Sequence, residues 1–475
     1  MLVNRKVTQN MRNPLLPPDV HIPDAEAHVF SDGKLYLYGS FDESRDYYCS
    51  GEYHVASTPD MKHWTVSDTS FETRQAKWVG SMADLAKAQM QGVHNFAELP
   101  IHLKRELTEE DQKLSIEAYK QRWYDKIAKQ AGNIKLLYAP DAIERNGLYY
   151  LYMCFSDGSE GVAVSNRPEG PFRNPVRLAA QGIDPAVFID DDGQAYYYWG
   201  QFSGCGAKLT EDMMSLDESS ITTGLVTEQN HFFHEGSSMR KRGDLYYYVF
   251  SDISRGRPTC LGYATARTPL GPFTYQGVII DNSGCDPASW NNHGSIEEFQ
   301  GQWYVFYHRS SRNSVNMRRV CCEKIYFDED GRIAEVPMTS QGAGDPFSAG
   351  EWVEAYRCCI LQGGAYLDLY EGQECIVNLT DGAEAVIRYI RVQDGQTVCV
   401  RGDGTARLQL YLDQELCGEG FMNAPIVFSC HPGVYELTIR VSDVHNCHIS
   451  GGNCEMRSRQ GYRLKFLSSE CSCQE

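Results

Sequence analysis

The chain has 475 residues, of which 42% are hydrophobic, and its formal net charge at pH 7 is -19. This length is too great for one ordinary hydrophobic core, and the hydrophobic content excludes a largely disordered protein. The acidic balance disfavours nucleic acids and membrane surfaces as partners, because both require a basic face.

The first twenty residues contain no apolar stretch of signal-peptide length, and no run of about 20 apolar residues occurs in the chain. The chain has 17 cysteines, an odd number. Adjacent cysteines, at Cys321–Cys322 and Cys358–Cys359, would place their thiols on opposite faces of a strand, which is poor geometry for a metal site. We therefore expect reduced, buried thiols in a cytoplasmic protein.

One sequence pattern occurs five times in the N-terminal part of the chain. Its first copy, DAEAHVFSDGKLYLYGS, begins at Asp24, and the others begin at Asp141, Asp184, Glu235 and His293. Each copy has a polar head, a short strand pattern, a glycine and a second strand rich in aromatic residues, which is typical of a β-hairpin. The glycines are Gly33, Gly147, Gly193, Gly243 and Gly301.

The spacing of the copies predicts the architecture. The last three begin about 50 to 60 residues apart, and a period of about 50 residues is typical of propeller blades of four strands each. Five copies therefore predict an all-β, five-bladed β-propeller. The longer gap after the first copy contains charged and apolar residues at helical spacing, and LTEED predicts a helix start at Thr108. We expect a helical insertion in the first blade at about residues 71–130.

The polar heads of the five copies indicate a functional site. The innermost strands of a propeller line its central channel, so the heads should converge at one rim. A single Asp at a strand start is commonly a turn residue. Four carboxylates in one funnel repel one another, however, so their recurrence at one repeat position favours function over stability.

Three kinds of reaction use clustered acids. Metal-assisted hydrolysis needs ligands that converge on an ion, and aspartic-protease chemistry needs two acids that share a proton. Inverting glycoside hydrolysis needs an acid and a base about 6.5–9.5 Å apart. Since the first and fourth of five blades face each other across the channel, the third reaction fits best. The aromatic side chains of Phe41 and Trp199, near the heads, would give sugars apolar faces to stack on.

The ordered set of motifs resembles glycoside hydrolase family 43. The motifs are IPDAEAHVF, LYAPDAI, GIDPAVFIDDDGQAYYYWG, HEGSSMRKRGDLYYYVFSD and NNHGSIEEFQGQWYVFYHRSS, and the resemblance covers about residues 14–345. It implies a five-bladed propeller that hydrolyses glycosidic bonds with inversion, mostly in saccharides that contain arabinose or xylose.

The resemblance also implies roles for individual residues. Asp24 would be the general base and Glu235 the general acid, while Asp184 would orient the acid and modulate its pKa. Because the acid must be protonated at working pH, burial and the charge of Asp184 should raise the pKa of Glu235. The base, in contrast, must stay ionised.

The resemblance implies supporting roles for further residues. Asp141 would be either a contact for substrate hydroxyls or a residue of the supporting network, and either Arg318 or Arg319 would contact the sugar. His293 matches a histidine near the channel centre that often lies beside a calcium ion or a water cluster. The mechanism requires no cofactor, and a structural calcium ion near His293 is the metal that the resemblance suggests.

The remainder of the chain predicts a second domain. A Gly- and Ser-rich joint at residues 338–352 precedes short alternating strands, so we expect a propeller at residues 1–345 and a β-sandwich at 346–475. The sandwich resembles a family 6 carbohydrate-binding module. The alternative is a domain that packs on the propeller and shapes its entrance.

These expectations combine into one leading function. We predict an exo-acting, inverting α-L-arabinofuranosidase, β-xylosidase or both, which acts on small imported oligosaccharides while the helical insertion walls off the funnel. One alternative keeps the fold and mechanism but changes the sugar, giving a galactofuranosidase, a galactanase or an arabinanase. The other is a non-catalytic propeller that binds glycans. The sequence does not predict the oligomeric state.

Overall fold

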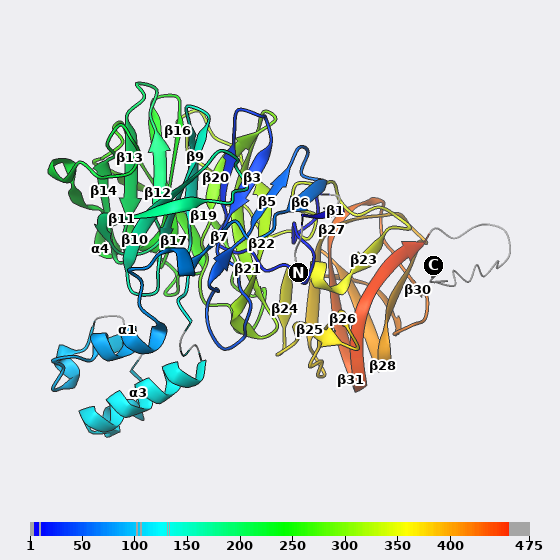
Figure 1. Cartoon of the computed structure of the whole chain (residues 1–475). Coiled ribbons are helices and arrows are strands. Elements are labelled where there is room, and N and C mark those ends of the chain that lie inside the picture. The colour runs from blue at the N-terminus through cyan, green and yellow to red at the C-terminus, as the bar shows by residue number, and fades with distance from the viewer. Residues whose placement is uncertain are drawn as a thin grey trace, which may run out of the picture.

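The computed structural model describes residues 4–8, 11–100, 103–104, 107–130, 132 and 134–455. They form a five-bladed β-propeller and a C-terminal β-sandwich, which lie side by side in Figure 1. The predicted all-β fold class is confirmed. Among the described helices, none has the length and apolar character needed to cross a membrane.

Each propeller blade is an antiparallel sheet that begins with one of the predicted hairpins. The first blade has the order β1-β6-β5-β3-β2, the next three have four strands each, and the fifth has three. The first blade contains β1 (Arg5–Thr8), β2 (Glu26–Val29), β3 (Leu35–Tyr38), β5 (Val55–Thr58) and β6 (His63–Val66), and the second contains β8 (Asp141–Arg145), β9 (Leu148–Cys154), β10 (Ser159–Ser165) and β11 (Arg173–Gln181). The third contains β12 (Ala186–Ile189), β13 (Ala195–Trp199), β14 (Ser203–Lys208) and β15 (Thr222–Thr227), and the fourth contains β16 (Phe233–Arg242), β17 (Leu245–Asp252), β18 (Cys260–Ala266) and β19 (Thr274–Asp281). The fifth contains β20 (Ser295–Phe299), β21 (Gln302–Ser311) and β22 (Ser314–Lys324).

Sequence pattern and packing explain the blades. The hairpin glycines all adopt positive φ, as with Gly33 at 74° and Gly193 at 84°, a conformation in which a Cβ is strained. The aromatic second strands are buried on both faces: Tyr152 and Tyr197, from neighbouring blades, share one hydrophobic cluster. A parallel bridge between Ala25 and Gly294 joins the first and last blades.

The fifth blade departs from the expected four strands. After β22 the chain does not return along this blade as a fourth strand. Ile333 and Met338 instead pack into the cluster between the fourth and fifth blades, and Val336 N donates a hydrogen bond to Ile279 O. This segment thus covers the blade edge on its way to the sandwich.

The helical insertion lies between the first two blades, but its boundaries differ from those expected. Phe71–Glu72 forms strand β7, which pairs with β4 (Glu52–Tyr53), because Phe71 is part of the core between the blades. The longer helices are α1 (Met82–Gln89) and α3 (Ile116–Gln130). Thr108 Oγ1 accepts a hydrogen bond from Asp111 N, but Asp111–Lys113 is only a 3₁₀ turn, so α3 starts later than LTEED suggested. The insertion has its own small hydrophobic cluster and projects away from the propeller (Figure 1).

Shorter helical elements occur at several connections. They are η1 (Thr73–Gln75), η2 (Phe96–Glu98), η4 (Glu218–Ser220), α4 (Glu228–His231) and η5 (Ala355–Arg357).

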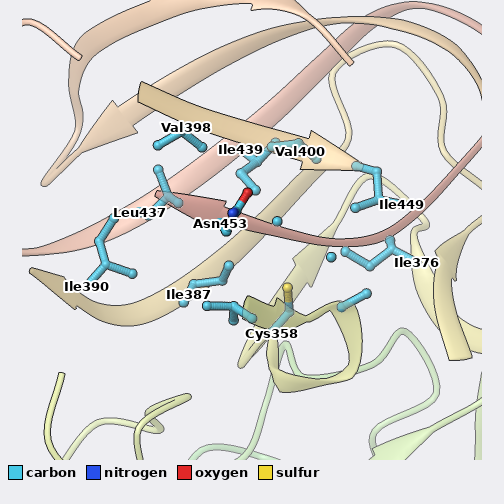
Figure 2. Close-up of a pocket in the computed structure, with 14 residues that line it drawn as sticks. Cys358, Ile376, Ile387, Ile390, Val398, Val400, Leu437, Ile439, Ile449 and Asn453 are labelled. Atoms are coloured by element: carbon cyan, nitrogen blue, oxygen red, sulfur yellow. The ribbon is translucent and has the colours of Figure 1, made fainter. Parts of the chain in front are cut away.

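The C-terminal sandwich is built from one curled, nine-stranded sheet. Its strands are β23 (Trp352–Glu354), β24 (Ile360–Gln362), β25 (Tyr366–Tyr370), β26 (Gln373–Val377), β27 (Glu384–Val392), β28 (Thr397–Leu412), β29 (Glu415–Phe421), β30 (Ile426–Val427) and β31 (Gly433–Glu455). Figure 2 shows Ile387, Leu437 and Ile439 turned toward a small internal cavity of about 40 Å³. Its lining is apolar, so we interpret it as a packing void. The segment GYRLKFLSS, residues 461–469, also has the pattern of a strand, but it lies outside the described residues.

Candidate active site

Asp24 and Asp184 occupy equivalent positions at the channel rim. Each lies two residues before the innermost strand of its blade, and their φ angles are 56° and 55°. Asp is one of the few residues with a Cβ that tolerate this left-handed conformation. Both side chains flank His293, whose Nδ1 is 3.9 Å from Asp24 Oδ1 and 3.8 Å from Asp184 Oδ2. The structure therefore brings together these three residues predicted from the sequence.

The carboxylate of Asp24 is buried and surrounded by cationic and polar groups. Arg318 Nη1 donates to Asp24 Oδ1 over 2.7 Å, and His308 Nδ1 lies 3.2 Å from the same oxygen. Ser40 Oγ donates to the other oxygen. Burial alone would raise the pKa of Asp24, but Arg318 and His308 outweigh it and hold the pKa far below its usual range. Asp24 therefore strongly favours its ionised form.

Arg318 is held in place by a second carboxylate. Asp42 accepts hydrogen bonds from Arg318 Nε, Nη2 and the backbone N, each over 2.9 Å. Since successive side chains of a strand point to opposite faces, Arg319 faces away from Asp24 and pairs with Glu374 of the sandwich. The structure thus answers the question that the sequence left open: Arg318, not Arg319, lies at the site.

Glu235 lies in the first strand of the fourth blade and is half-buried. Its Oε2 accepts a hydrogen bond from Gln201 Nε2 over 2.8 Å. The next residue, Gly236, has a φ of 77°, and a Cβ there would lie 2.8 Å from Ser251 Oγ and 3.0 Å from the His293 ring. Gly236 N also donates to the carboxyl group of Asp184. This close packing explains the E-G pair and connects the Glu235 backbone with Asp184 and His293.

The electrostatics of Asp184 are opposite to those of Asp24. Burial raises the pKa of Asp184 well above its usual value, and the negative charges of Glu235 and Asp24 raise it further. A proton is therefore favoured on Asp184. The site combines an ionised carboxylate on the first blade with a carboxyl group on the third blade that favours its protonated form.

Asp141 lies deeper in the channel than the other predicted residues. It is fully buried, and its oxygens lie 2.6 Å from His28 Nε2, 2.7 Å from Val187 N and 2.6 Å from Ala142 N. These contacts occupy both oxygens of its carboxyl group. A signal in the sequence anticipated this: Asp24 and Asp184 lie nine residues before their turn glycines, whereas Asp141 lies only six before Gly147.

The two predicted stacking residues differ in their surroundings. Trp199 is 6% exposed and belongs to the core between the second and third blades, with its ring centroid 5.7 Å from that of Tyr197. Phe41 is half-buried and lies edge-on to His54, at a centroid distance of 4.6 Å.

Sequence reasoning missed Tyr48, Asp42 and His308. The guanidinium group of Arg318 lies 5.0 Å from the centroid of the half-buried Tyr48 ring. Burial raises the pKa of the Tyr48 hydroxyl, and the charge of Glu235 adds to this effect. Tyr48 therefore lies close to both sides of the site. These three residues are not heads of the repeat. They reach the rim only because the five blades close into a ring.

The surroundings of His293 are a poor fit for direct calcium coordination. Calcium prefers six to eight oxygen ligands. Of the two carboxyl groups beside His293, Asp24 is already paired with Arg318, and Asp184 favours its protonated form. A second buried group, Glu26, His28 and Asp141, has ligand atoms within 4.8 Å of one another, but Arg240 already pairs with Glu26. We therefore assign no step of the chemistry to a metal at either place.

Comparisons with known proteins place the chain among glycosidases. A sequence profile described as "Glycosyl hydrolases family 43" matches residues 93–333. A xylosidase/arabinosidase of Thermoclostridium stercorarium is 30% identical, with 88% of this chain and 90% of the relative covered.

Two solved structures extend the comparison to three dimensions. A β-xylosidase/α-arabinofuranosidase from a compost microbial metagenome, solved in complex with xylotriose in a calcium-free form, is 25% identical, has a TM-score of 0.51, and is matched over 70% of this chain and 99% of its own. An arabinoxylan arabinofuranohydrolase of Bacillus subtilis shares the fold over 95% of this chain and 99% of its own, with 21% identity and a TM-score of 0.50. The second likeness extends into the sandwich.

Proposed function

Since the chain belongs to family 43 of the glycosyl hydrolases and is a glycosidase, we propose that Asp24 and Glu235 are its general base and general acid. The observation that carries this assignment is the opposite electrostatics of the two sides of the site. Arg318 keeps Asp24 ionised, while burial and the negative charge of Glu235 favour a proton on the carboxyl group of Asp184. Inverting hydrolysis requires one ionised and one protonated carboxyl group.

Each residue has a step in the proposed mechanism. Asp24 accepts a proton from the attacking water, and Glu235 donates a proton to the oxygen of the leaving group. Asp184 orients the acid through Gly236 and favours proton retention. Arg318 holds the base in its ionised form. We propose that Asp141 acts indirectly, by fixing His28 and the start of β12, and that Trp199 supports the wall of the site from behind.

The proposed substrates are short oligosaccharides that contain xylose or arabinose. Support comes from the xylosidase/arabinosidase relative and from the related structure that holds xylotriose. We further propose exo action, because the helical insertion is connected to the propeller beside the rim. The chain returns from the insertion at Leu137, which forms β-bridges with both Ser50 and Phe155. Release of single pentoses from one end of xylotriose supports exo action, whereas cleavage within longer chains before any monosaccharide appears contradicts it.

The catalytic assignment can be tested with Asp24→Asn and Glu235→Gln. Both variants should fold normally and lose at least about a thousandfold in kcat on an aryl pentoside with a poor leaving group, since each removes one proton transfer. With an activated leaving group, the Glu235 variant should recover much of its rate but the Asp24 variant should not. Asp192→Asn, in an exposed hairpin turn, is the matched control. Near-normal rates in either variant on the poor substrate would refute the assignment.

No metal takes part in the proposed chemical steps. We propose that a calcium ion bound near His293 would have a structural role. Dialysis against a chelator should therefore leave most of the turnover intact, whereas complete loss that is restored by calcium would show that a metal is essential.

We also propose a reducing, cytoplasmic location. The described cysteines are free thiols and most are buried, including both adjacent pairs. Such thiols suit a reducing compartment. Recovery of the activity from the culture medium rather than the cytosolic fraction of its source cells would refute this location.

A further inference from the structure

A polar pocket lies at the rim between the fourth and fifth blades. It has a volume of about 480 Å³ and is lined by the loop after β17, the loop after β19 and one residue of the sandwich. Lining residues include Arg257, Thr259, Asp286 and Ser289 from the propeller and Leu361 from β24. Leu361 N donates to Gly284 O over 2.8 Å, so the sandwich closes one side of the pocket.

An exposed tryptophan stands at the edge of this pocket. Trp290 is 48% exposed, and the guanidinium carbon of Arg257 lies 5.6 Å from its ring centroid. Within the described part of the chain, we find no carboxylate paired with Arg257. A flat ring beside a hydrogen-bond donor suits the apolar face and the hydroxyls of a sugar.

The loop that carries Trp290 is held rigidly and connects directly to the catalytic residues. Asn292 N donates to Pro258 O over 2.7 Å, joining the two loops. Asn291 O lies 3.0 Å from His308 Nε2, and the other ring nitrogen of His308 lies 3.2 Å from Asp24. The pocket is therefore preformed, and its edge is separated from the catalytic base by one side chain.

We infer that this pocket, with Trp290 and Arg257 at its edge, is a binding site for the sugar units on the leaving-group side of the oligosaccharide. This inference rests on the proposed function. The leaving oxygen must lie beside Glu235 on the fourth blade, so the rest of the substrate has to continue along the rim on that side. The loop after β19 that lines the pocket runs on to His293, whose ring lies against Gly236, so the pocket opens on the same rim as Glu235.

The charges of the pocket favour a neutral ligand. Arg255 is already paired with Asp281 and Glu335, and the two oxygens of Asp286 accept hydrogen bonds from Ala288 N and Asn313 N. Arg257 remains as a hydrogen-bond donor in this pocket. This set suits neutral pentose units better than acidic sugars, which would approach Asp281 and Asp286.

The test compares substrates of different length. In Trp290→Ala, the ratio of kcat/KM for xylotriose to kcat/KM for nitrophenyl xyloside should fall about tenfold, because stacking is lost only for the longer substrate. Arg257→Gln should lower the same ratio less. Tyr326→Ala removes another exposed aromatic side chain, just beyond the end of β22 that is remote from the rim, and should leave the ratio unchanged. An unchanged ratio in Trp290→Ala overturns the inference.

A binding experiment separates this inference from the proposed function. Xylotriose and xylose are titrated into Glu235→Gln protein with and without Trp290→Ala. The second substitution should weaken xylotriose binding about tenfold relative to xylose binding. Equal weakening of both, or of neither, overturns the subsite even if wild-type turnover is normal. If the wild type hydrolyses no pentoside at all, the proposed function fails, and the titration still decides the subsite.

Discussion

At the scale of single residues, the site depends on how one arginine is placed. Arg318 contacts the buried carboxylates of Asp24 and Asp42, and both of these acids lie where burial opposes ionisation. The guanidinium of Arg318 therefore both contacts Asp24, the proposed base, and favours its ionised form. A lysine would not reproduce this arrangement, since it lacks the planar fork that spans two carboxylates.

Replacing Arg318 by Met should change the pH profile as well as the rate. The arginine holds the pKa of Asp24 below its ordinary value, so its loss leaves burial unopposed and the pKa rises. The base would then be protonated in mild acid, and the acidic limb of kcat/KM should move to higher pH by about 1–3 units. Arg332→Met, at an exposed turn, is the control. An unshifted acidic limb would show that Arg318 does not govern the ionisation of the base.

At the scale of strands and blades, the repeat pattern predicted most of the fold. The five glycine turns identified the five hairpins, because a positive φ and alternating aromatic residues are local properties. Features that depend on longer-range packing were not predictable from the pattern. The depth of Asp141, the strand at Phe71–Glu72 and the missing fourth strand of the last blade all follow from contacts between blades.

A buried acid in the second blade shows the energetic consequence of such packing. Glu160, in β10, is fully buried. One of its carboxyl oxygens accepts a hydrogen bond from the hydroxyl of Tyr197 in β13, and the other has no hydrogen-bond partner among the described residues. Burial raises the pKa of Glu160 to about 8. In the unfolded chain, Glu160 loses this proton near pH 4. The contribution of Glu160 to the free energy of unfolding should therefore fall as the pH rises from about 4 to about 8.

Glu160→Gln should remove this dependence. Between pH 5 and pH 7 the free energy of unfolding of the wild type should fall by about 2–3 kcal/mol more than that of the variant. Denaturant titrations of both proteins at the two pH values would measure the difference. Parallel behaviour would mean that Glu160 is ionised in the folded protein.

At the scale of the whole molecule, the sandwich is joined to the propeller by a buried ion pair. Arg319 Nη1 lies 2.7 Å from Glu374 Oε2, and both side chains are almost completely buried. A second, more exposed pair joins Arg45, in the loop that follows Asp42, to Asp368 of β25. The domain thus supports the loop that holds Arg318. Its resemblance to a carbohydrate-binding module stays a prediction.

Glu374→Ala should loosen this interface, because it leaves the Arg319 charge buried without a partner. We expect a loss of about 3–5 kcal/mol and, in calorimetry, separate unfolding of the two domains. Asp368→Ala, which removes the partner of Arg45 at the surface, should cost about 1 kcal/mol or less. Equal effects of the two substitutions would contradict the importance of the buried pair.

The central claim is that an ionised Asp24 and a protonated Glu235 act on the substrate from opposite sides without a covalent intermediate. The most direct measurement is proton NMR of the first sugar that the wild-type enzyme releases from nitrophenyl β-D-xyloside. The account predicts that α-D-xylose appears first and then mutarotates. Initial release of β-D-xylose would require a nucleophilic carboxylate and would contradict it.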